Sequence, residues 1–477
     1  MADPSPLGAK VRSLRRREGM SQARLATRLG ISASYLNLIE HNRRALPAPL
    51  LIKLADVFAL DLRELSADHD QRLQADLLEA FGDPLFDPHD LTAAEVRELA
   101  ASYPPVARAV LALYQGYRGA REAVDTLTAK LTDGDLSGVD STRLPTEEVS
   151  DLIQRHMNHF PALEQGAEEL WRRARLDGED LYGGLCRHLR DAHGIRVQLE
   201  TTAAMRGAMR RYDPERRVLH LSELLRRGSR NFQLAHQVGL AEQQDALRRL
   251  AEDPMLTSDP ARALARVALA NYFAAAVLMP YERFLEAARA ERYDLELLGH
   301  RFRTGFEQTC HRLTTLRRAG AEGVPFHMVR VDVAGNISKR FSASGLRFAR
   351  FSGACPRWNV FSAFTTPGMI RTQLSQMPDG TTWFWVARTV RKEGGGYHAP
   401  HSLLAVALGC EVSHARELVY AEGVDLESRT ALVPVGLTCR LCERMDCEQR
   451  AFPPLQHPLD VNENVRGVSF YAPVSDG

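Results

Sequence analysis

The chain has 477 residues, 44% of them hydrophobic and 25% charged, which is typical of a globular protein with about three domains. Its 61 Lys and Arg nearly balance its 60 Asp and Glu, so no global field attracts the whole chain to nucleic acid. The sequence opens without a secretion signal, and no run reaches the roughly 18 apolar residues of a membrane span. We therefore expect a cytoplasmic protein with no membrane partner.

The first domain, residues 1–68, begins with local positive charge and continues as short amphipathic helices. Five basic residues lie within the first helical segment: Lys10, Arg12, Arg15, Arg16 and Arg17. Ser21 is placed to cap a helix over 22–29, and Gly30 supplies a turn. Ser32 caps the next helix, and Pro49 opens a fourth. This pattern predicts a helix-turn-helix.

Residues 6–66 resemble the Cro/C1-like (XRE) DNA-binding domain, with 21–26 and 34–40 as the matching segments. The resemblance implies operator DNA as partner. It places Gln22 and Arg43 at phosphates and turns four short polar or aromatic side chains towards the major groove: Ser32, Ser34, Tyr35 and Asn37. The alternative is a small helical dimerisation bundle with solvated basic faces.

Residues 69–146 form the second region, a helical stretch rich in leucine and alanine and interrupted by prolines. We expect it to connect the domains and to make the protein a homodimer. The polar, turn-rich residues 132–150 read as a linker.

Residues 147–319 form a middle domain in which 232–240 and 271–280 resemble the ImmA/IrrE zinc metallopeptidases, implying an α+β zincin-like fold. In that family two histidines of an H-E-x-x-H helix hold zinc and the glutamate activates water. Here Gln237 and Leu240 replace the glutamate and the second histidine. We therefore expect no catalytic residues, no peptidase activity and a hydrogen-bonded core role for His236. A metalloprotease that cleaves a repressor is the weaker alternative.

Residues 320–477 read as an α+β C-terminal domain. Alternating segments predict strands over 326–332 and 381–390, each beside a glycine-containing turn. Helices are expected over 403–408 and 414–420.

A dense cysteine cluster lies near the end of this domain. Cys439, Cys442 and Cys447 occupy nine positions, a spacing that suits zinc or an iron–sulfur cluster. Cys410 is the expected fourth ligand, with Cys355 as the alternative. Free buried thiols or a disulfide are the competing interpretations.

The segments 355–361, 409–411, 418–423 and the cysteine cluster resemble the C-terminal domain of the short-chain fatty acyl-CoA regulators, the PrpR/RamB-like family. The resemblance implies a transcription factor for propionate and acetate metabolism genes that senses a short-chain acyl-CoA. It also implies a [4Fe-4S] iron–sulfur cluster, with zinc as the alternative. A redox- or iron-responsive regulator signalling through the cluster is the second hypothesis.

Aromatic and basic residues of this domain are candidates for an acyl-CoA site: Arg347, Arg357, Trp358, Trp383, Trp385 and Arg388. The rings could line an apolar pocket and the guanidinium groups could pair with CoA phosphates. Equally, strand aromatics are usually core, and arginines usually face solvent.

Overall fold

The computed structural model describes residues 8, 11–12, 14–15, 18–40, 43–44, 46–58, 67–83, 85–86, 92–133, 145–346, 348, 354–392, 401–440 and 442–453. The chain divides into two compact units. Unit 1 combines residues 1–142, 349–352 and 437–477, and unit 2 combines 143–348 and 353–436. The cysteine cluster thus groups with the N-terminal helices rather than with the sheet that precedes it in sequence.

Unit 1 contains the predicted helix-turn-helix. Helix α2 (Gln22–Leu29) starts at Ser21, whose hydroxyl accepts the Arg24 N–H, and ends at Gly30 with φ +72°. Helix α3 (Ala33–Glu40) starts at Ser32, whose hydroxyl accepts the Tyr35 N–H, and α4 spans Ala48–Phe58. Their apolar faces meet in one core: Val11, Leu25, Ala26, Leu29, Leu36 and Leu54. The predicted helices and caps are confirmed.

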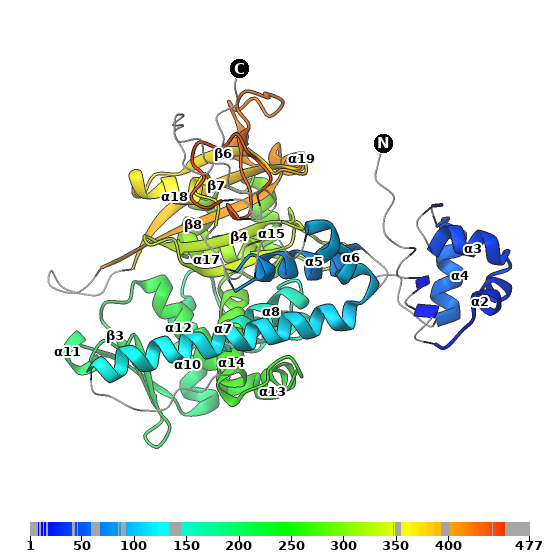
Figure 1. Ribbon diagram of the computed structural model, residues 1–477. Coiled ribbons are helices and arrows are strands. Elements are labelled where there is room, and N and C mark those ends of the chain that lie inside the picture. Colours follow the sequence, from blue (N-terminus) through cyan, green and yellow to red (C-terminus); the bar gives the residue numbers. More distant parts are fainter. Residues whose placement is uncertain are drawn as a thin grey trace. The chain divides into compact units, whose positions relative to one another are not determined.

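Three further helices of unit 1 form a separate core. Helix α5 (Ala67–Phe81), α6 (Ala93–Ser102) and the 30-residue α7 (Pro104–Asp133) pack through Leu77, Ala100 and Ala107. A capping box between Thr92 and Glu95 starts α6. The long α7 is visible as one continuous helix in Figure 1. The predicted helical linker is present. The polar linker predicted over 132–150 is wrong where the structure describes it, because 132–133 end α7 and 145–150 begin the helix α8 (Pro145–Arg155); residues 134–144 lie outside the described residues.

The first part of unit 2 is mainly helical: α8 (Pro145–Arg155), α9 (Pro161–Arg173), α10 (Leu181–His193), α11 (Thr202–Met205), α12 (Arg227–Glu242), α13 (Gln244–Ala251), α14 (Asp259–Leu278), α15 (Tyr281–Ala290), α16 (Leu295–Arg301) and α17 (Phe306–Leu313). A small sheet of order β1-β3-β2 accompanies these helices, built from β1 (Arg196–Glu200), β2 (Arg210–Asp213) and β3 (Val218–Ser222). Strand β1 is parallel to β3 and β2 is antiparallel to it.

The second part of unit 2 is a six-stranded sheet of order β5-β4-β8-β7-β6-β9. Its strands are β4 (His327–Asp332), β5 (Ile337–Ser342), β6 (Arg371–Gln376), β7 (Thr382–Lys392), β8 (Ser402–Glu411) and β9 (Val433–Pro434). All neighbours are antiparallel except β6 and β9. The fold classes expected for all three domains are confirmed.

The helix predicted over 403–408 is wrong, because these residues form the centre of β8. Strand β8 pairs with β4 on one edge and β7 on the other, and its consecutive residues 405–410 are all buried, so both of its faces are covered. Such a strand has a continuous apolar sequence and lacks the alternation that marks a half-exposed strand. The helix expected over 414–420 is reduced to two short turns, α19 (Val412–Ala415) and η2 (Val419–Ala421).

One hydrophobic core joins the helices and the large sheet. Leu234 of α12 and Phe273 of α14 belong to the same cluster as Met328, Phe384 and Val406 of the sheet. Helix α14 is the only described helix long and apolar enough to cross a membrane, but 61% of its apolar window is buried in unit 2. It is therefore explained as a core helix.

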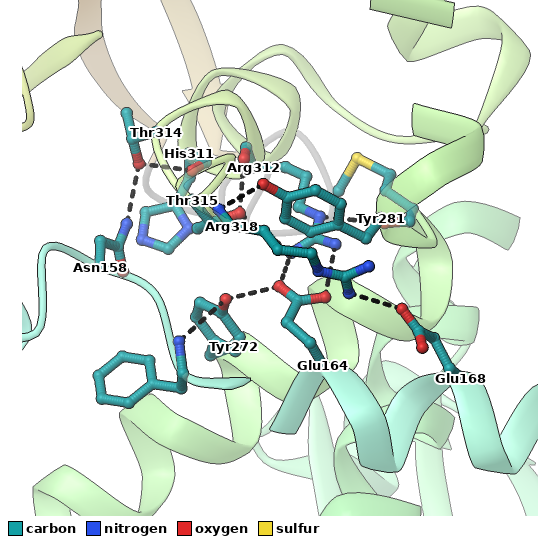
Figure 2. Close-up of polar contacts among 12 residues, drawn as sticks. Asn158, Glu164, Glu168, Tyr272, Tyr281, His311, Arg312, Thr314, Thr315 and Arg318 are labelled. Atoms are coloured by element: carbon teal, nitrogen blue, oxygen red, sulfur yellow. Dashed lines mark hydrogen bonds and ion pairs between the residues drawn. The ribbon is translucent and has the colours of Figure 1, made fainter. Parts of the chain in front are cut away.

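A buried ion pair links three helices of this core (Figure 2). The Arg312 guanidinium of α17 donates to both carboxylate oxygens of Glu164 of α9, at 2.5 and 2.9 Å, and the Tyr272 hydroxyl of α14 donates to the same carboxylate at 2.5 Å. Arg312 also donates to the Met279 carbonyl and to the Thr315 hydroxyl. Arg312 is fully buried and Glu164 is 1% exposed. Removing these two charges from water costs free energy, and the hydrogen bonds among Arg312, Glu164 and their neighbours offset that cost.

A second charged cluster ties α17 to the sheet. The carboxylate of Glu307 meets Arg330 of β4 at 2.6 Å, Lys339 of β5 at 3.5 Å and Lys392 of β7 at 2.8 Å. Burial alone would raise the pKa of Glu307, but the surrounding cations outweigh it and lower that pKa to about 2.

Glu164→Gln is expected to destabilise unit 2 by about 3–5 kcal/mol, because it leaves the Arg312 charge buried and uncompensated. All four tryptophans, at 171, 358, 383 and 385, lie in unit 2, so urea unfolding followed by tryptophan fluorescence reports on that unit. Arg262→Gln, which breaks an exposed ion pair with Asp259, is the matched control and should cost less than about 1 kcal/mol. Equal costs for both variants would contradict the central role of the buried pair.

Glu307→Gln is expected to lower stability by about 3 kcal/mol at neutral pH and to flatten its acid dependence. Because the folded pKa lies below the ordinary 4.5, this contribution is complete above about pH 4.5 and is lost as pH falls towards 2. The stability difference between wild type and variant, measured by urea unfolding at pH 7, 4 and 3, should therefore shrink with acidity. A constant difference would refute this assignment.

Candidate functional site

An ion pair positions the predicted recognition helix α3. The Arg15 guanidinium donates to both carboxylate oxygens of Glu40, at 2.6 and 2.9 Å, and to the Met20 carbonyl at 2.9 Å. Gln22 at the start of α2 donates to Glu40 at 3.0 Å and to the Asn37 side chain at 3.2 Å. Glu40 is the last residue of α3 and is 3% exposed. Its hydrogen bond from Gln22 therefore joins the first turn of α2 to the last turn of α3.

The residues expected to meet DNA lie on the outer side of this motif. Ser32, Ser34 and Asn37 are exposed, and Tyr35 is half-buried beneath the Arg44 guanidinium at 5.6 Å from the ring centre. Arg43 is also exposed, whereas Lys10, Arg16 and Arg17 fall outside the described residues. The sequence analysis did not predict that Arg44, which follows α3, covers the ring of Tyr35.

Helix α12 carries the segment that resembles the zinc-binding H-E-x-x-H helix, with His236, Gln237 and Leu240 at the positions of the motif. His236 is 3% exposed, and the Gln237 side chain accepts a 2.7 Å hydrogen bond from Arg210 of β2. Leu240 packs against an apolar cluster that includes Leu163 and Leu269. Within the described residues, His236 belongs to no set of three ligand atoms close enough to hold one ion.

His236 is buried as expected. The side chain of Asn271 on α14 interacts with its ring, which favours the protonated form only weakly. Burial, helped by the nearby Arg210 charge, lowers the pKa of His236 to about 4, so the ring is neutral at physiological pH.

The cysteine cluster of unit 1 is built around a buried arginine. The Arg450 guanidinium donates to the backbone carbonyls of Cys439 at 2.5 Å, Cys442 at 2.8 Å and Arg444 at 2.5 Å. The Ala451 N–H points at the Cys439 sulfur at 3.4 Å. Arg450 is 5% exposed and therefore adds a desolvated positive charge to the loop that carries the thiols.

The surroundings of the three thiols suit anionic sulfur ligands. Four sulfurs around zinc lie about 3.8 Å apart, because Zn–S bonds are about 2.3 Å long. The sulfurs of Cys439, Cys442 and Cys447 do not form such a close set. A buried cation and an N–H aimed at sulfur both favour a negatively charged thiolate cluster. Burial raises the pKa of the Cys442 thiol, while the Arg444 N–H and the Arg450 charge oppose that shift.

The two candidate fourth ligands lie in unit 2. Cys410 occupies β8 on the face that packs against the helices, it is fully buried, and burial raises the pKa of its thiol strongly. Cys355 is also buried, at 6% exposed. Cys410 therefore has the surroundings of a core thiol.

The aromatic candidates pack together on the opposite face of the sheet. His327 lies 5.1 Å from Trp383 and 4.3 Å from Trp385, and Trp358 lies 5.6 Å from Trp385, measured between ring centres. The indole N–H groups of Trp358, Trp383 and Trp385 donate to Gly436, Thr381 and Ser375. Gly409 is required beside them, since an added Cβ would lie 2.3 Å from the His327 ring. The three tryptophans are core residues whose polar groups are satisfied, whereas Nε2 of His327 has no hydrogen-bond partner among the described residues.

The basic candidates have different surroundings. Arg388 pairs with Glu296 at 2.7 Å and stacks over Phe306, whereas Arg357 is half-exposed and its carbonyl accepts from Gln373. Arg347 lies outside the described residues.

Comparisons with known proteins find matches along most of the chain. Three family models match successive segments: helix-turn-helix over 11–65, IrrE N-terminal-like domain over 190–314, and short-chain fatty acyl coenzyme A regulator, C-terminal, over 315–471. A solved chain described as a Mycobacterium tuberculosis transcriptional regulator superimposes with a TM-score of 0.67 at 43% identity, covering 69% of this chain and all of that one.

Characterised relatives match almost the entire length. RamB of M. tuberculosis is 41% identical over 472 residues, covering 98% of both chains. PrpR of the same organism is 40% identical and covers 96% of this chain and 93% of its own. The propionyl-CoA carboxylase regulator of Cereibacter sphaeroides is 40% identical and covers 99% of both. The chain therefore belongs to the family of RamB and PrpR, the helix-turn-helix, DNA-binding transcriptional regulators with a short-chain fatty acyl coenzyme A regulator domain.

Proposed function

We propose that this regulator senses a short-chain acyl-CoA in unit 2 and, as a cytoplasmic homodimer, controls genes of propionate or acetate metabolism. The observation that carries the proposal is the match of residues 315–471 to the acyl coenzyme A regulator model within a chain that also carries the DNA-binding motif. The name of the C. sphaeroides relative supports propionyl-CoA metabolism as the regulated process.

Two sets of contacts suggest how a ligand in unit 2 could act on DNA binding. Within unit 2, Trp358 of the aromatic cluster donates to the carbonyl of Gly436, the last residue before the chain enters the cysteine loop of unit 1. Within unit 1, Arg440 of that loop donates to the Gly82 carbonyl after α5 at 2.8 Å. A ligand that moved Trp358 would therefore act through four residues of chain on the helices that follow the DNA-binding domain.

Among the predicted ligand residues, Arg357 is the best candidate to bind a CoA phosphate. It is half-exposed, whereas Arg388 already neutralises Glu296. The three buried tryptophans would shape an apolar wall rather than donate hydrogen bonds, since their N–H groups are already bonded.

The homodimer is supported by an apolar row beside and on α7. Tyr103, Val106 and Leu113 are each at least half exposed, with Leu113 at 76%. Val106 and Leu113 lie seven residues apart on one face of α7, and Tyr103 directly precedes that helix. A second copy of this helix would bury that row.

We also propose that Cys439, Cys442 and Cys447 hold a [4Fe-4S] cluster, with Cys410 as the fourth ligand and Cys355 as the alternative. When bound, the cluster supplies redox chemistry and negative charge. The chain's own part is to orient the thiols: Arg450 fixes the loop carbonyls and Ala451 donates to Cys439.

A redox-responsive regulator is the second candidate function. It is favoured by the contacts of the cysteine loop with the helices that follow the DNA-binding domain, through Arg440 to Gly82 and Glu443 to Arg97. Loss of a cluster would change that loop without any acyl-CoA.

The acyl-CoA proposal is tested with genomic fragments selected by the full-length protein. Propionyl-CoA or acetyl-CoA should shift the Kd for such a fragment by about 5–150-fold, the usual range of coupling between two sites, with free CoA as control. Asn37→Ala should weaken binding by about 10–100-fold through loss of a base contact, and Arg262→Gln should not. Sedimentation in the same buffer gives the oligomeric mass. Indifference to every acyl-CoA, with DNA binding intact, would leave only the redox candidate.

The cluster proposal is tested by anaerobic purification. Wild type should be brown with about four iron atoms per chain, and Cys439→Ser and Cys410→Ser should lose most of the iron. Cys186→Ser is the matched control, since Cys186 is half-buried on α10 and lies far from the cysteine loop in sequence. Iron loss in Cys355→Ser but not in Cys410→Ser would make Cys355 the fourth ligand. A colourless protein with one zinc per chain would overturn the cluster.

A further inference from the structure

Two histidines and a glutamate of unit 2 converge outside the sites described above. His188 lies on α10, His193 is its last residue, and Glu242 is the last residue of α12. The Nε2 atoms of His188 and His193 lie 2.5 and 2.8 Å from the same Glu242 oxygen, Oε1. Across the described residues, this is the one set of three His, Cys, Asp or Glu ligand atoms that all lie within 4.8 Å of one another.

The spacing of the two histidines hides this arrangement in the sequence. Residues five apart on a helix point about 140° away from each other, so an H-x4-H pattern is not a ligand signature. Convergence is possible because α10 ends at His193, with Gly194 in the left-handed conformation at φ +66°. His193 can therefore turn back towards the same point as His188.

Neighbouring side chains hold the three ligand atoms close together. The His188 and Glu242 side chains are each 9% exposed, and His193 is 23% exposed. Arg173 of α9 pairs with the other oxygen of Glu242, Oε2, which leaves Oε1 facing the two imidazole rings. The rings meet edge to face, with centres 5.7 Å apart, so both nitrogens can approach one point without the rings colliding.

We propose that His188 Nε2, His193 Nε2 and Glu242 Oε1 are the three protein ligands of a divalent transition-metal site that best suits zinc. Zinc bonds to nitrogen and carboxylate oxygen are about 2.0–2.2 Å long, which places tetrahedral ligand atoms about 3.4 Å apart. Each imidazole must therefore move about 1 Å or less away from Oε1 to admit the ion. Two imidazoles disfavour calcium and magnesium, which take oxygen ligands. Arg173 is the outer partner that orients the carboxylate.

This site is distinct from the position of the lost peptidase centre. Glu242 follows His236 by six residues on the same helix, about 9 Å along its axis, and the two share no ligand. A bound ion would join the end of α10 to the end of α12. The inference depends on neither the acyl-CoA site nor the cysteine loop.

Cobalt(II) added to full-length, metal-stripped protein tests the site, because its spectrum separates ligand types. Cobalt bound by nitrogen and oxygen gives weak visible bands, whereas cobalt bound by the cysteine loop gives intense near-ultraviolet thiolate bands. We expect one equivalent of the nitrogen–oxygen type, displaced by zinc. Zinc at 100-fold over its Kd should also raise the Tm of unit 2 by about 4–8 °C.

His188→Gln and His193→Gln should each weaken this equivalent at least about 100-fold and leave the thiolate bands unchanged. His220→Gln is the matched control: His220 meets the Glu200 carboxylate at 3.0 Å in a pair that has no second histidine. Circular dichroism in the presence of chelator verifies folding, and Glu242→Gln provides a second variant should a histidine variant fail to fold. Absence of the nitrogen–oxygen equivalent in wild type, or its persistence in all three variants, would overturn the site.

Discussion

The bonded pair of Arg312 and Glu164 is the constraint on which unit 2 depends. Neither charge could be buried alone, because the cost of removing an ion from water is several kcal/mol. Together with the Tyr272 hydroxyl, they require α9, α14 and α17 to meet at one point. Around that point Arg318 bridges Glu168 and Glu282 and stacks over Tyr281 at 4.2 Å, which extends the same network to the surface (Figure 2).

Helix α17, which carries Arg312, is also bonded to the large sheet. Glu307 lies on α17, five residues before Arg312, and its carboxylate collects cations from β4, β5 and β7. The zincin-like helices and the C-terminal sheet therefore share one core. A family boundary at residue 314 or 315 separates two sequence modules, but it does not separate two folding units.

The sequence predicted best where local chemistry decides the structure. Ser21 and Ser32 are placed as helix caps, Gly30 as a turn, and the helix-turn-helix follows from them. Prediction failed where only tertiary contacts decide the structure. The apolar sequence of residues 403–408 suits a buried helix and a buried strand equally well, and pairing with β4 and β7 makes it a strand. Likewise Arg450 looks like any surface arginine in sequence, yet it lies buried at the centre of the cysteine loop.

Unit 1 is assembled from both ends of the chain, and this has a consequence for synthesis. The contacts of Arg97 with Glu443 and of Gly82 with Arg440 join residues 346 and 358 positions apart. During synthesis, α5 and α6 leave the ribosome long before Arg440 and Glu443 are added to the chain. The contacts that complete this part of unit 1 can therefore form only late in translation.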